Sequence, residues 1–436
     1  MCERLRTTLL HSFVPAVRDS TAKIAPWLLG VAGVAALVWL VHRGWLSTDN
    51  PHADFYDFYW AADAARRGTD IYASGDGGYV YPPLLATLLM PITLMDPQHA
   101  MQVWILACAA GLAWCAWHCA AIARRAAGCP ENAAGTIAIA GMTLLVLADS
   151  FRSEFQWANC NVVMLVAIVL ALRMVARHPV LAGGLLAIAC FVKYLPIGFL
   201  AYFAIRRQWR AMAGMACGLL ACALAPALWL GWSENLDGLA RAARGMGVMS
   251  GAVQHEHAAK IIPIDAPYSL SITSGIARML GPQRAAPQFA GVVGLAAVAA
   301  LGAGYFVYRV HGRQLFARGV ATVWTHVGVV TVAEWSCVLA GALAFSPQTQ
   351  KRHFNLLVPL VALLIALAAR TAGATRRWAI AAMLMLAVGV TPMPNIPGTR
   401  GFIDGTWKWM GGPGWMVVLV CLVLMHVALR TDRRHE

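Results

Sequence analysis

PWLLGVAGVAALVWLV, at residues 26–41, is an unbroken apolar run that ends in the segment His42-Arg-Gly-Trp45. No small-residue cleavage site follows it, so we expect an uncleaved signal-anchor helix. Similar runs recur along the 436 residues, of which 59% are hydrophobic and only 12% are charged. A soluble domain carries more charge and interrupts its apolar runs. The sequence therefore predicts an all-α, polytopic membrane protein.

Length and charge predict the number and the orientation of the spans. One helical crossing takes roughly 20 apolar residues, and we expect about ten transmembrane helices. They lie over Pro26–Val41, Met101–Ala123, Ala133–Ala148, Asn159–Val175, Arg210–Leu230, Gln288–Val307, Gly319–Phe345, Phe354–Ala369, Trp378–Val390 and Gly414–Leu429. Basic residues gather in the short loops between spans, so the positive-inside rule places both termini in the cytoplasm. Orientation thus explains the net charge of +14, and we expect no nucleic-acid partner.

One apolar segment, Val180–Ile205, has basic residues at both ends and Lys193-Tyr-Leu-Pro196 in its middle. A single crossing would place one basic cluster on the wrong side of the membrane. Two short half-helices that turn near Lys193 and Pro196 satisfy the positive-inside rule. They also account for the proline, because proline interrupts a helix. Leu84–Met95 is too short to cross and is also expected to be a half-helix.

The first outer loop, Leu46–Ala100, carries seven aspartates against Arg66 and Arg67. An acidic outer loop agrees with basic inner loops. A second long outer segment, Gly231–Pro287, is amphipathic and is a candidate cover for a site. The chain has no repeat of fixed period and no soluble domain, so we expect residues 1–436 to form a single integral membrane domain.

Carboxylates lie among aromatic rings directly after the first span, in Asp54-Phe-Tyr-Asp-Phe-Tyr-Trp-Ala-Ala62. Asp54 and Asp57 are three residues apart, so both face one side of a helix. Crowding by rings partly desolvates a carboxylate and favours its neutral form, a property wanted of a general base near neutral pH. Asp54 and Asp57 are therefore candidate catalytic residues. The alternative is that Asp54 caps the helix and Asp57 is merely solvated.

Tyrosine and amide side chains at the same boundary are candidate substrate contacts. Tyr59 belongs to the aromatic tract, and Tyr81 belongs to Tyr79-Val-Tyr-Pro-Pro83. Gln156 and Asn159 open the fourth span, where amides can hydrogen-bond sugar hydroxyls or a phosphate. They could equally bind neighbouring helices.

Three adjacent donors, Lys351, Arg352 and His353, stand at the outer end of a span. Together they suit a lipid phosphate. Basic residues are usually found on the cytoplasmic side, so three donors at an outer end favour a functional role for them. Snorkelling to ordinary lipid headgroups is the alternative.

Two ionisable residues lie inside apolar segments. An ammonium group such as Lys193 is costly there and usually marks a site or an ion pair, with Asp149 or Glu154 as its structural partner. Glu334 lies within a span and is expected to be paired inside the bundle, with a contribution to the cavity of the site as the alternative.

Cysteine and histidine patterns give no metal signature. Most of the 11 cysteines lie in hydrophobic stretches, and Cys115 and Cys119, which share a helix face, fit small buried residues better than ligands or disulfides. The cluster His255-Glu-His257 with Lys260 has a spacing that matches no strong metal site. We predict neither a metal nor a cofactor.

These elements, in this order, resemble glycosyltransferase family 87, a polyprenyl-phosphate-sugar-dependent family of the GT-C superfamily. Its Asp-Phe-x-x-Tyr-Tyr-x-Ala-Ala-like motif is matched by Asp54–Ala62, with Phe58 in a tyrosine position, and its Ile/Val-Lys-x-x-Pro element by Val192–Pro196. The other matches are Gly68–Tyr72 to a Gly-x-x-x-Tyr element, Tyr81–Leu85 to a Tyr-x-Pro-Pro-leucine-rich element, Arg206–Trp209 to a basic-Trp turn, and Ser346–His353 to a Ser-Pro-x-Ser/Thr turn that leads to His.

The chain departs from the family pattern at two places. The family usually has Gly-Gln-x-Asn where this chain has Phe155-Gln-Trp-Ala-Asn159, so one spacing differs. Gln350 and Arg352 replace the aromatic residue and the histidine of the Ser-Pro turn. These changes bear on the phosphate contacts and on the identity of the sugar.

The resemblance implies a GT-C-like bundle in the plasma (inner) membrane with an extracytoplasmic active site. The implied activity is an inverting hexosyltransferase that moves a sugar, mannose by family precedent, from a polyprenyl-phosphate donor to a lipid or glycan acceptor. By position, Asp54 is the base, and Asp57 orients the acceptor or shares that role. The cations Lys193, Arg352 and His353 then bind the departing phosphate. The donor lipid is a co-substrate, so no cofactor is implied.

Two other functions fit the same elements. A transporter or flippase for a lipid-linked sugar would move its substrate without forming a glycosidic bond; inverted repeats would favour it, and the sequence has none. An O-antigen-ligase-like transferase would use a diphosphate-linked glycan as donor.

Overall fold

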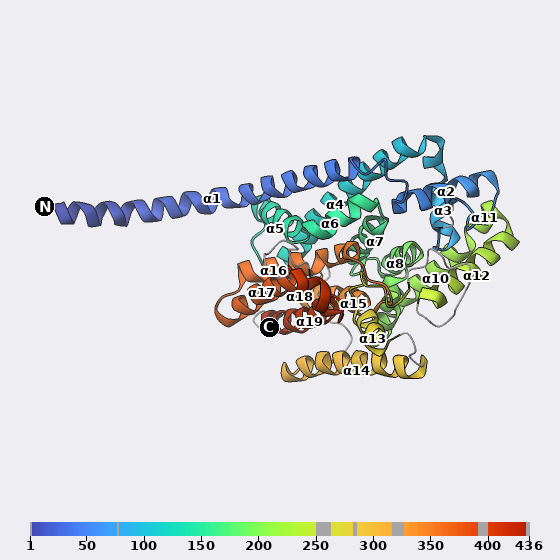
Figure 1. Ribbon diagram of the computed structural model, residues 1–436. Helices are drawn as coiled ribbons and strands as arrows, with labels where there is room; N and C mark the ends of the chain where they lie inside the picture. The colour runs from blue at the N-terminus through green and yellow to red at the C-terminus, as the bar shows by residue number, and fades with distance from the viewer. Residues whose placement is uncertain are drawn as a thin grey trace.

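A computed structural model describes residues 2–75, 78–249, 263–281, 286–315, 327–390 and 400–432. Over these residues the chain is helical and contains no strand, which confirms the predicted all-α class. The long helix α1 runs along one side of the bundle, and its N-terminal part projects beyond the rest of the molecule (Figure 1). At the other end of the bundle lie the short helices that follow α1 in sequence.

The helices follow one another along the described part of the chain. In chain order they are α1 (Cys2–Trp45), α2 (Asp54–Arg67), α3 (Pro83–Leu89), η1 (Met90–Leu94), α4 (Pro97–Ala126), α5 (Ala133–Val146), α6 (Ala148–Trp157), α7 (Asn161–Met174), α8 (Pro179–Val192), η2 (Leu195–Gly198), α9 (Phe199–Ile205), α10 (Trp209–Leu224), α11 (Ala227–Leu230), α12 (Trp232–Met249), α13 (Ile272–Leu280), α14 (Ala286–Val310), α15 (Val329–Phe345), η3 (Lys351–Leu357), α16 (Val358–Arg370), α17 (Gly373–Met385), η4 (Leu386–Val390), α18 (Arg400–Phe402), η5 (Ile403–Trp407) and α19 (Gly412–Asp432).

Each predicted span contains a helix, and residues 319–326 of the predicted span Gly319–Phe345 lie outside the described residues. In the described part of the chain, seven helices are long and apolar enough to cross a membrane, or eight if α5 and α6, which meet at an angle of 67°, form one broken span. Two further predicted spans hold shorter helices, since α7 has 14 residues and α15 has 17. The chain is therefore a polytopic membrane protein. The predicted total of about ten spans includes α7 and α15, which are short for a crossing.

The predicted turn at Lys193 and Pro196 is confirmed by helix packing. An added Cβ at Gly214 of α10 would lie 2.1 Å from the carbonyl oxygen of Val180, and one at Gly218 would lie 3.0 Å from the Cα of Gly184. Helices α8 and α10 therefore run in the same direction in close contact. The chain between them, η2 and α9, must bring the backbone back.

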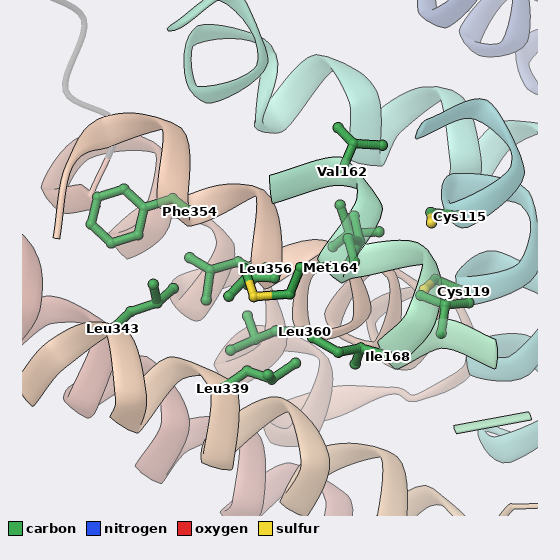
Figure 2. Packing of buried hydrophobic residues seen from close by; sticks show 14 of the residues in the cluster. Cys115, Cys119, Val162, Met164, Ile168, Leu339, Leu343, Phe354, Leu356 and Leu360 are labelled. Atoms are coloured by element: carbon green, nitrogen blue, oxygen red, sulfur yellow. The ribbon is translucent and has the colours of Figure 1, made fainter. Parts of the chain in front are cut away.

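The core lies around η3 and α16, because 94% of the most apolar stretch within Lys351–Arg370 is buried, whereas none of the corresponding stretch of α14 is. Figure 2 shows Met164 and Ile168 of α7 among Leu356 and Leu360, the residues that lead into and begin α16. Leu339 and Leu343 of α15 close the cluster from the other side, and Cys115 and Cys119 are buried in α4. This rigid core carries η3 and the start of α7, where polar residues collect.

Candidate active site

A cavity of about 760 Å³ lies among α2, the segment before α3, the turn after α8, α12 and the segment that joins α15 to η3. Six of the candidate residues named from the sequence line it: Asp54, Asp57, Tyr81, Lys193, Arg352 and His353. Ala243, Met246 and Gly247 of α12 contribute one wall, so the amphipathic segment Gly231–Pro287 does border the site. Leu195, Ile197 and Phe345 make a further part of the lining apolar.

Asp54 is the first residue of α2 and points toward the cations rather than back along its helix. The N-cap position belongs to Ala53, which makes no side-chain cap. The Asp54 carboxylate accepts a hydrogen bond from Asn159 Nδ2 and pairs with Arg352, whose Nη2 lies 2.9 Å from Oδ2. Asp54 therefore belongs to a charged network and does not serve as a helix cap.

Asp57 lies on the same face of α2, as its spacing predicted, and also borders the cavity. Its carboxylate packs against the backbone of Gly78, where an added Cβ would lie 2.2 Å from Oδ1. A Cβ at this position would force the Asp57 carboxylate to move. The segment before α3 thus fixes one carboxylate, while η3 and α7 fix the other.

Lys193 points its ammonium group at the centre of the network. The backbone is extended there (φ −154°, ψ 139°), which ends α8. Nζ donates to Asn159 Oδ1 at 2.8 Å and to Asn161 Oδ1 at 2.9 Å, and lies 3.1 Å from His353 Nε2. These contacts account for an ammonium group in an apolar segment, because a buried charge requires hydrogen-bonding partners.

The three adjacent donors Lys351, Arg352 and His353 begin η3, and their side chains point in different directions. The side chains of Gln350 and His353 each accept a hydrogen bond from the other's backbone N–H, which fixes the start of η3. Arg352 stacks on Trp157, with its guanidinium carbon 5.3 Å from the ring centroid, and Lys351 points away to pair with Asp149. Arg352 Nε finds no hydrogen-bond partner in the described part of the chain, so this guanidinium keeps a donor unused.

Tyr81 joins the aromatic wall to the cations. Its ring lies 5.4 Å from that of Phe58 and 5.9 Å from Lys193 Nζ. Burial, followed by the neighbouring Cys160 and Asp54, raises the pKa of Tyr81 well above its ordinary value. The phenol therefore keeps its proton and can serve as a hydrogen-bond donor.

Four candidates do not line the cavity. Tyr59 is buried and donates to the Met95 carbonyl oxygen at 2.8 Å, and Gln156 and Lys351 lie beyond the wall. Asn159 lies behind the wall as the link between Asp54 and Lys193. No three His, Cys, Asp or Glu side chains gather around a metal position within the described residues. The cluster His255-Glu-His257 with Lys260 lies outside them.

Sequence reasoning missed Asn161 and the stacked Trp157 because it aligned the amide motif on Gln156. In the structure α6 ends at Trp157, and Ala158 adopts a left-handed conformation, with φ 43° and ψ 49°. This is a conformation that glycine adopts most easily. Ala158-Asn-Cys-Asn161 therefore corresponds to Gly-Gln-x-Asn with no change in spacing. The signal available in the sequence was the second asparagine, two residues after Asn159.

Comparisons with known proteins identify a family for the chain. No curated protein matches the sequence. The family model of glycosyltransferase family 87 matches residues 79–333, a range that contains Tyr81, Asn159 and Lys193 and stops short of Asp54 and Arg352. Because the match covers more than half of the chain, the protein belongs to glycosyltransferase family 87 and is a membrane-spanning glycosyltransferase.

Proposed function

We propose that the protein transfers a sugar from a polyprenyl-phosphate donor to a lipid or glycan acceptor, with inversion at the anomeric carbon, on the extracytoplasmic face of the plasma membrane. Mannose is the leading donor sugar by family precedent. One observation carries the proposal. Asp54 and the cations Arg352 and Lys193 share a single cavity.

In the proposed step, an acceptor hydroxyl attacks C1 of the donor sugar while the bond from C1 to the phosphate oxygen breaks. Asp54 accepts the hydroxyl proton, and the electron pair of the broken bond stays on the phosphate. A phosphate leaving group needs little protonation, so one carboxylate and a cationic clamp suffice, whereas a glycosidase needs paired acids. Single displacement at C1 accounts for inversion.

In the proposed mechanism Arg352 contacts both the base, Asp54, and the phosphate of the donor. It is paired with Asp54 at 2.9 Å and lines the cavity, so an incoming phosphate can engage its guanidinium group beside the base. Lys193 lies on the other side of Asn159 and adds a second cation for the same phosphate, with His353 Nε2 3.1 Å from its Nζ. Fixed cations at a developing charge are the main source of catalysis in such reactions. The apolar lining at Leu195, Ile197 and Phe345 suits the first isoprene units of the lipid.

The orientation of the cavity rests on charge. Basic residues between spans assign α1 a cytoplasmic start, and the cavity lies at the opposite end of α1, next to α2. The proposed location is therefore extracytoplasmic, with both termini cytoplasmic.

The test is transfer of radiolabelled mannose from polyprenyl-phosphate mannose in proteoliposomes that contain a membrane extract as acceptor source. We expect Asp54→Asn to lower turnover by about 10²–10⁴-fold, the usual worth of a general base. Asp70→Asn is the matched control, since it removes the same charge from the exposed loop after α2 and should retain near wild-type turnover. Full turnover by Asp54→Asn would remove this residue from the role.

The same preparation separates the competing functions. A transferase that uses diphosphate-linked glycans would be inhibited by the diphosphate lipid far more strongly than by the monophosphate lipid. A flippase would move labelled donor across the bilayer without forming a glycosidic product. Either result would overturn the proposed donor chemistry.

A further inference from the structure

A second carboxylate lies behind the cavity, where the proposed mechanism does not use it. Glu154 is on α6, and only 1% of its surface is exposed. Its Oε2 accepts from Asn161 Nδ2 at 2.7 Å, and its Oε1 accepts from the backbone N–H of Val162 at 3.3 Å. A buried carboxylate is costly unless it is paired with charge or with hydrogen-bond donors.

The amide of Asn161 has one permitted orientation between its two neighbours. Glu154 as a carboxylate can only accept hydrogen bonds, and the ammonium group of Lys193 can only donate them. Asn161 must therefore turn its NH₂ to Glu154 and its Oδ1 to Lys193, at 2.9 Å. A neutral group in place of the carboxylate would remove this constraint.

Asn159 repeats the arrangement on the other side of Lys193. Its NH₂ faces the Asp54 carboxylate, and its Oδ1 accepts from Lys193 at 2.8 Å. The ammonium group thus lies between two asparagines, and each asparagine is oriented by one carboxylate. One carboxylate, Asp54, lines the cavity, and the other, Glu154, is sealed from it.

We propose that Glu154 is a positioning residue for the transfer, acting on the donor phosphate through Asn161 and Lys193. It orients the Asn161 carbonyl oxygen toward Lys193 and supplies a second negative charge close to the ammonium group. Lys193 is then held at the cavity wall and is not drawn wholly to Asp54, so Asp54 remains available to the acceptor. This inference rests on the proposed function, since it assigns a phosphate to Lys193.

A purely structural role is the competing explanation, because Glu154 also accepts a backbone hydrogen bond from Val162 at the start of α7. The two explanations differ in their dependence on Lys193. An N-terminal hydrogen bond of α7 does not depend on the ammonium group, whereas positioning does. Glu154→Gln keeps a carbonyl oxygen for Val162 and removes the charge that orients Asn161.

The experiment is a double-mutant cycle with Glu154→Gln and Lys193→Met. For the transfer reaction we expect Glu154→Gln to lower kcat/KM for the donor by about tenfold or more, the usual cost of losing a group that orients a ligand. The KM of the acceptor should be little changed. In the Lys193→Met background the same substitution should change kcat/KM by less than about twofold, because the group through which it acts is absent.

Melting temperatures of the purified proteins provide a readout that does not require turnover. Glu154 and Lys193 carry opposite charges and are linked through Asn161, so either single substitution leaves the other charge with less compensation, and the double variant should melt above the value that additivity predicts. Glu334→Gln is the matched control, since it alters a buried carboxylate whose partner is Arg206, and its effect should add to that of Lys193→Met.

The outcomes distinguish the positioning role of Glu154 from the proposed transfer function. Multiplicative losses in kcat/KM and additive losses in melting temperature would overturn the positioning role and leave Glu154 as a structural residue. A wild-type protein without transfer activity, combined with non-additive melting temperatures, would overturn the proposed function but not the coupling of Glu154 to Lys193.

Discussion

Two buried clusters of charge illustrate how similar residues acquire different roles in this fold. The cavity cluster contains Asp54, Asn159, Lys193, Arg352 and His353. The Glu334 cluster contains Glu334, Arg206, Tyr202 and Tyr308. Both place ionisable groups among apolar helices, where such groups are costly.

The Glu334 cluster is closed. Glu334 pairs with Arg206 at 2.9 Å and accepts from the hydroxyls of Tyr202 and Tyr308, while Arg206 also donates to the carbonyl oxygen of Leu315. The side chains of the ion pair are 8% and 7% exposed, and neither residue lines the cavity of the candidate site. Its charged and hydroxyl groups contact one another and do not reach the cavity, so the cluster ties α9 and α14 to α15.

The cavity cluster is open. Asp54, Lys193, Arg352 and His353 border a space large enough for a sugar phosphate, and Asn159 links them from behind the wall. A buried charge in a membrane protein thus indicates function only where it faces a cavity. Mutations in the two clusters should therefore differ in what they damage.

The largest effect is expected from breaking the Glu334 cluster. Removing one partner of a buried ion pair costs about 3–5 kcal/mol of stability, so Glu334→Gln should lower the free energy of unfolding by an amount of that order. Turnover per folded molecule should be unchanged, because the cluster does not reach the cavity. Denaturation in detergent micelles, followed by assays of the folded fraction, measures both quantities.

A double substitution serves as the control for that prediction. Glu334→Gln combined with Arg206→Met leaves no uncompensated charge and should recover part of the lost stability. A large loss of turnover in fully folded Glu334→Gln would contradict the division between the two clusters.

The second prediction compares neighbours in η3. Arg352 faces the cavity, and Lys351 pairs with Asp149 outside it. We expect Arg352→Ala to lower kcat/KM for the donor by about 10²–10³-fold, the typical loss when one preorganised donor to a developing charge is removed. Lys351→Ala should lower it by only a few-fold. Equal losses in steady-state assays would show that Lys351 also contacts the donor.

The positions of the charged residues in the two clusters could largely be predicted from the sequence, because charges are costly inside apolar segments. The turn at Lys193 follows from charge at both ends of one apolar segment together with Pro196. The pairing of Glu334 inside the bundle follows from the cost of a lone carboxylate there. The aromatic crowding of Asp54 likewise predicted its place at the cavity.

The roles of Asn161 and Glu154 could not be predicted in the same way. They depend on a single backbone dihedral angle at Ala158, which turns the chain so that Asn159 and Asn161 flank Lys193. Alanine gives no sequence signal for a left-handed conformation, and a nearby Gln156 matched the amide pattern by residue type. The distances that join α2, α8 and η3 are likewise tertiary and leave no local pattern.

The third prediction concerns Ala158 itself. A left-handed conformation costs a residue with a Cβ about 1–2 kcal/mol, whereas glycine adopts it freely but loses about 0.4–1 kcal/mol through the unfolded chain. Ala158→Gly should therefore raise the free energy of unfolding by about 0.5 kcal/mol, the balance of those two contributions. Ala167→Gly, within α7, is the matched control and should lower it by about 1 kcal/mol. Destabilisation by Ala158→Gly would contradict the alignment of Ala158 with the glycine of the family motif.

The smallest effect is expected where α12 meets the loop after α2. Arg241 of α12 lies 2.7 Å from Asp70 and 2.8 Å from Asp237, and the Tyr72 hydroxyl is 2.8 Å from the Gly238 carbonyl oxygen. The ion pair between Asp70 and Arg241 is about 40% exposed on each side, with side chains at 42% and 41%. Solvent screening limits such pairs to about 0.2–1 kcal/mol.

The pH dependence of that contact has a definite sign. Burial alone would raise the pKa of Asp70, but the backbone N–H of Tyr72 and the guanidinium of Arg241 lower it below its ordinary value. A carboxylate whose folded pKa is depressed stabilises the protein above its unfolded pKa of about 3.9, and that contribution disappears as the pH falls through the folded pKa. Asp70→Asn should therefore melt slightly below wild type at pH 7, and the difference should shrink below about pH 4 and vanish once the pH lies below the folded pKa of Asp70.

Ionic strength gives an independent check on the same pair. Raising salt from about 0.01 M to 1 M shortens the screening length from about 30 Å to 3 Å, so the difference between wild type and Asp70→Asn at pH 7 should shrink. The melting difference for Glu334→Gln should persist under the same conditions, because its pair is shielded from solvent. If salt changed both differences equally, the distinction between an exposed contact at the cavity wall and a closed cluster in the bundle would fail.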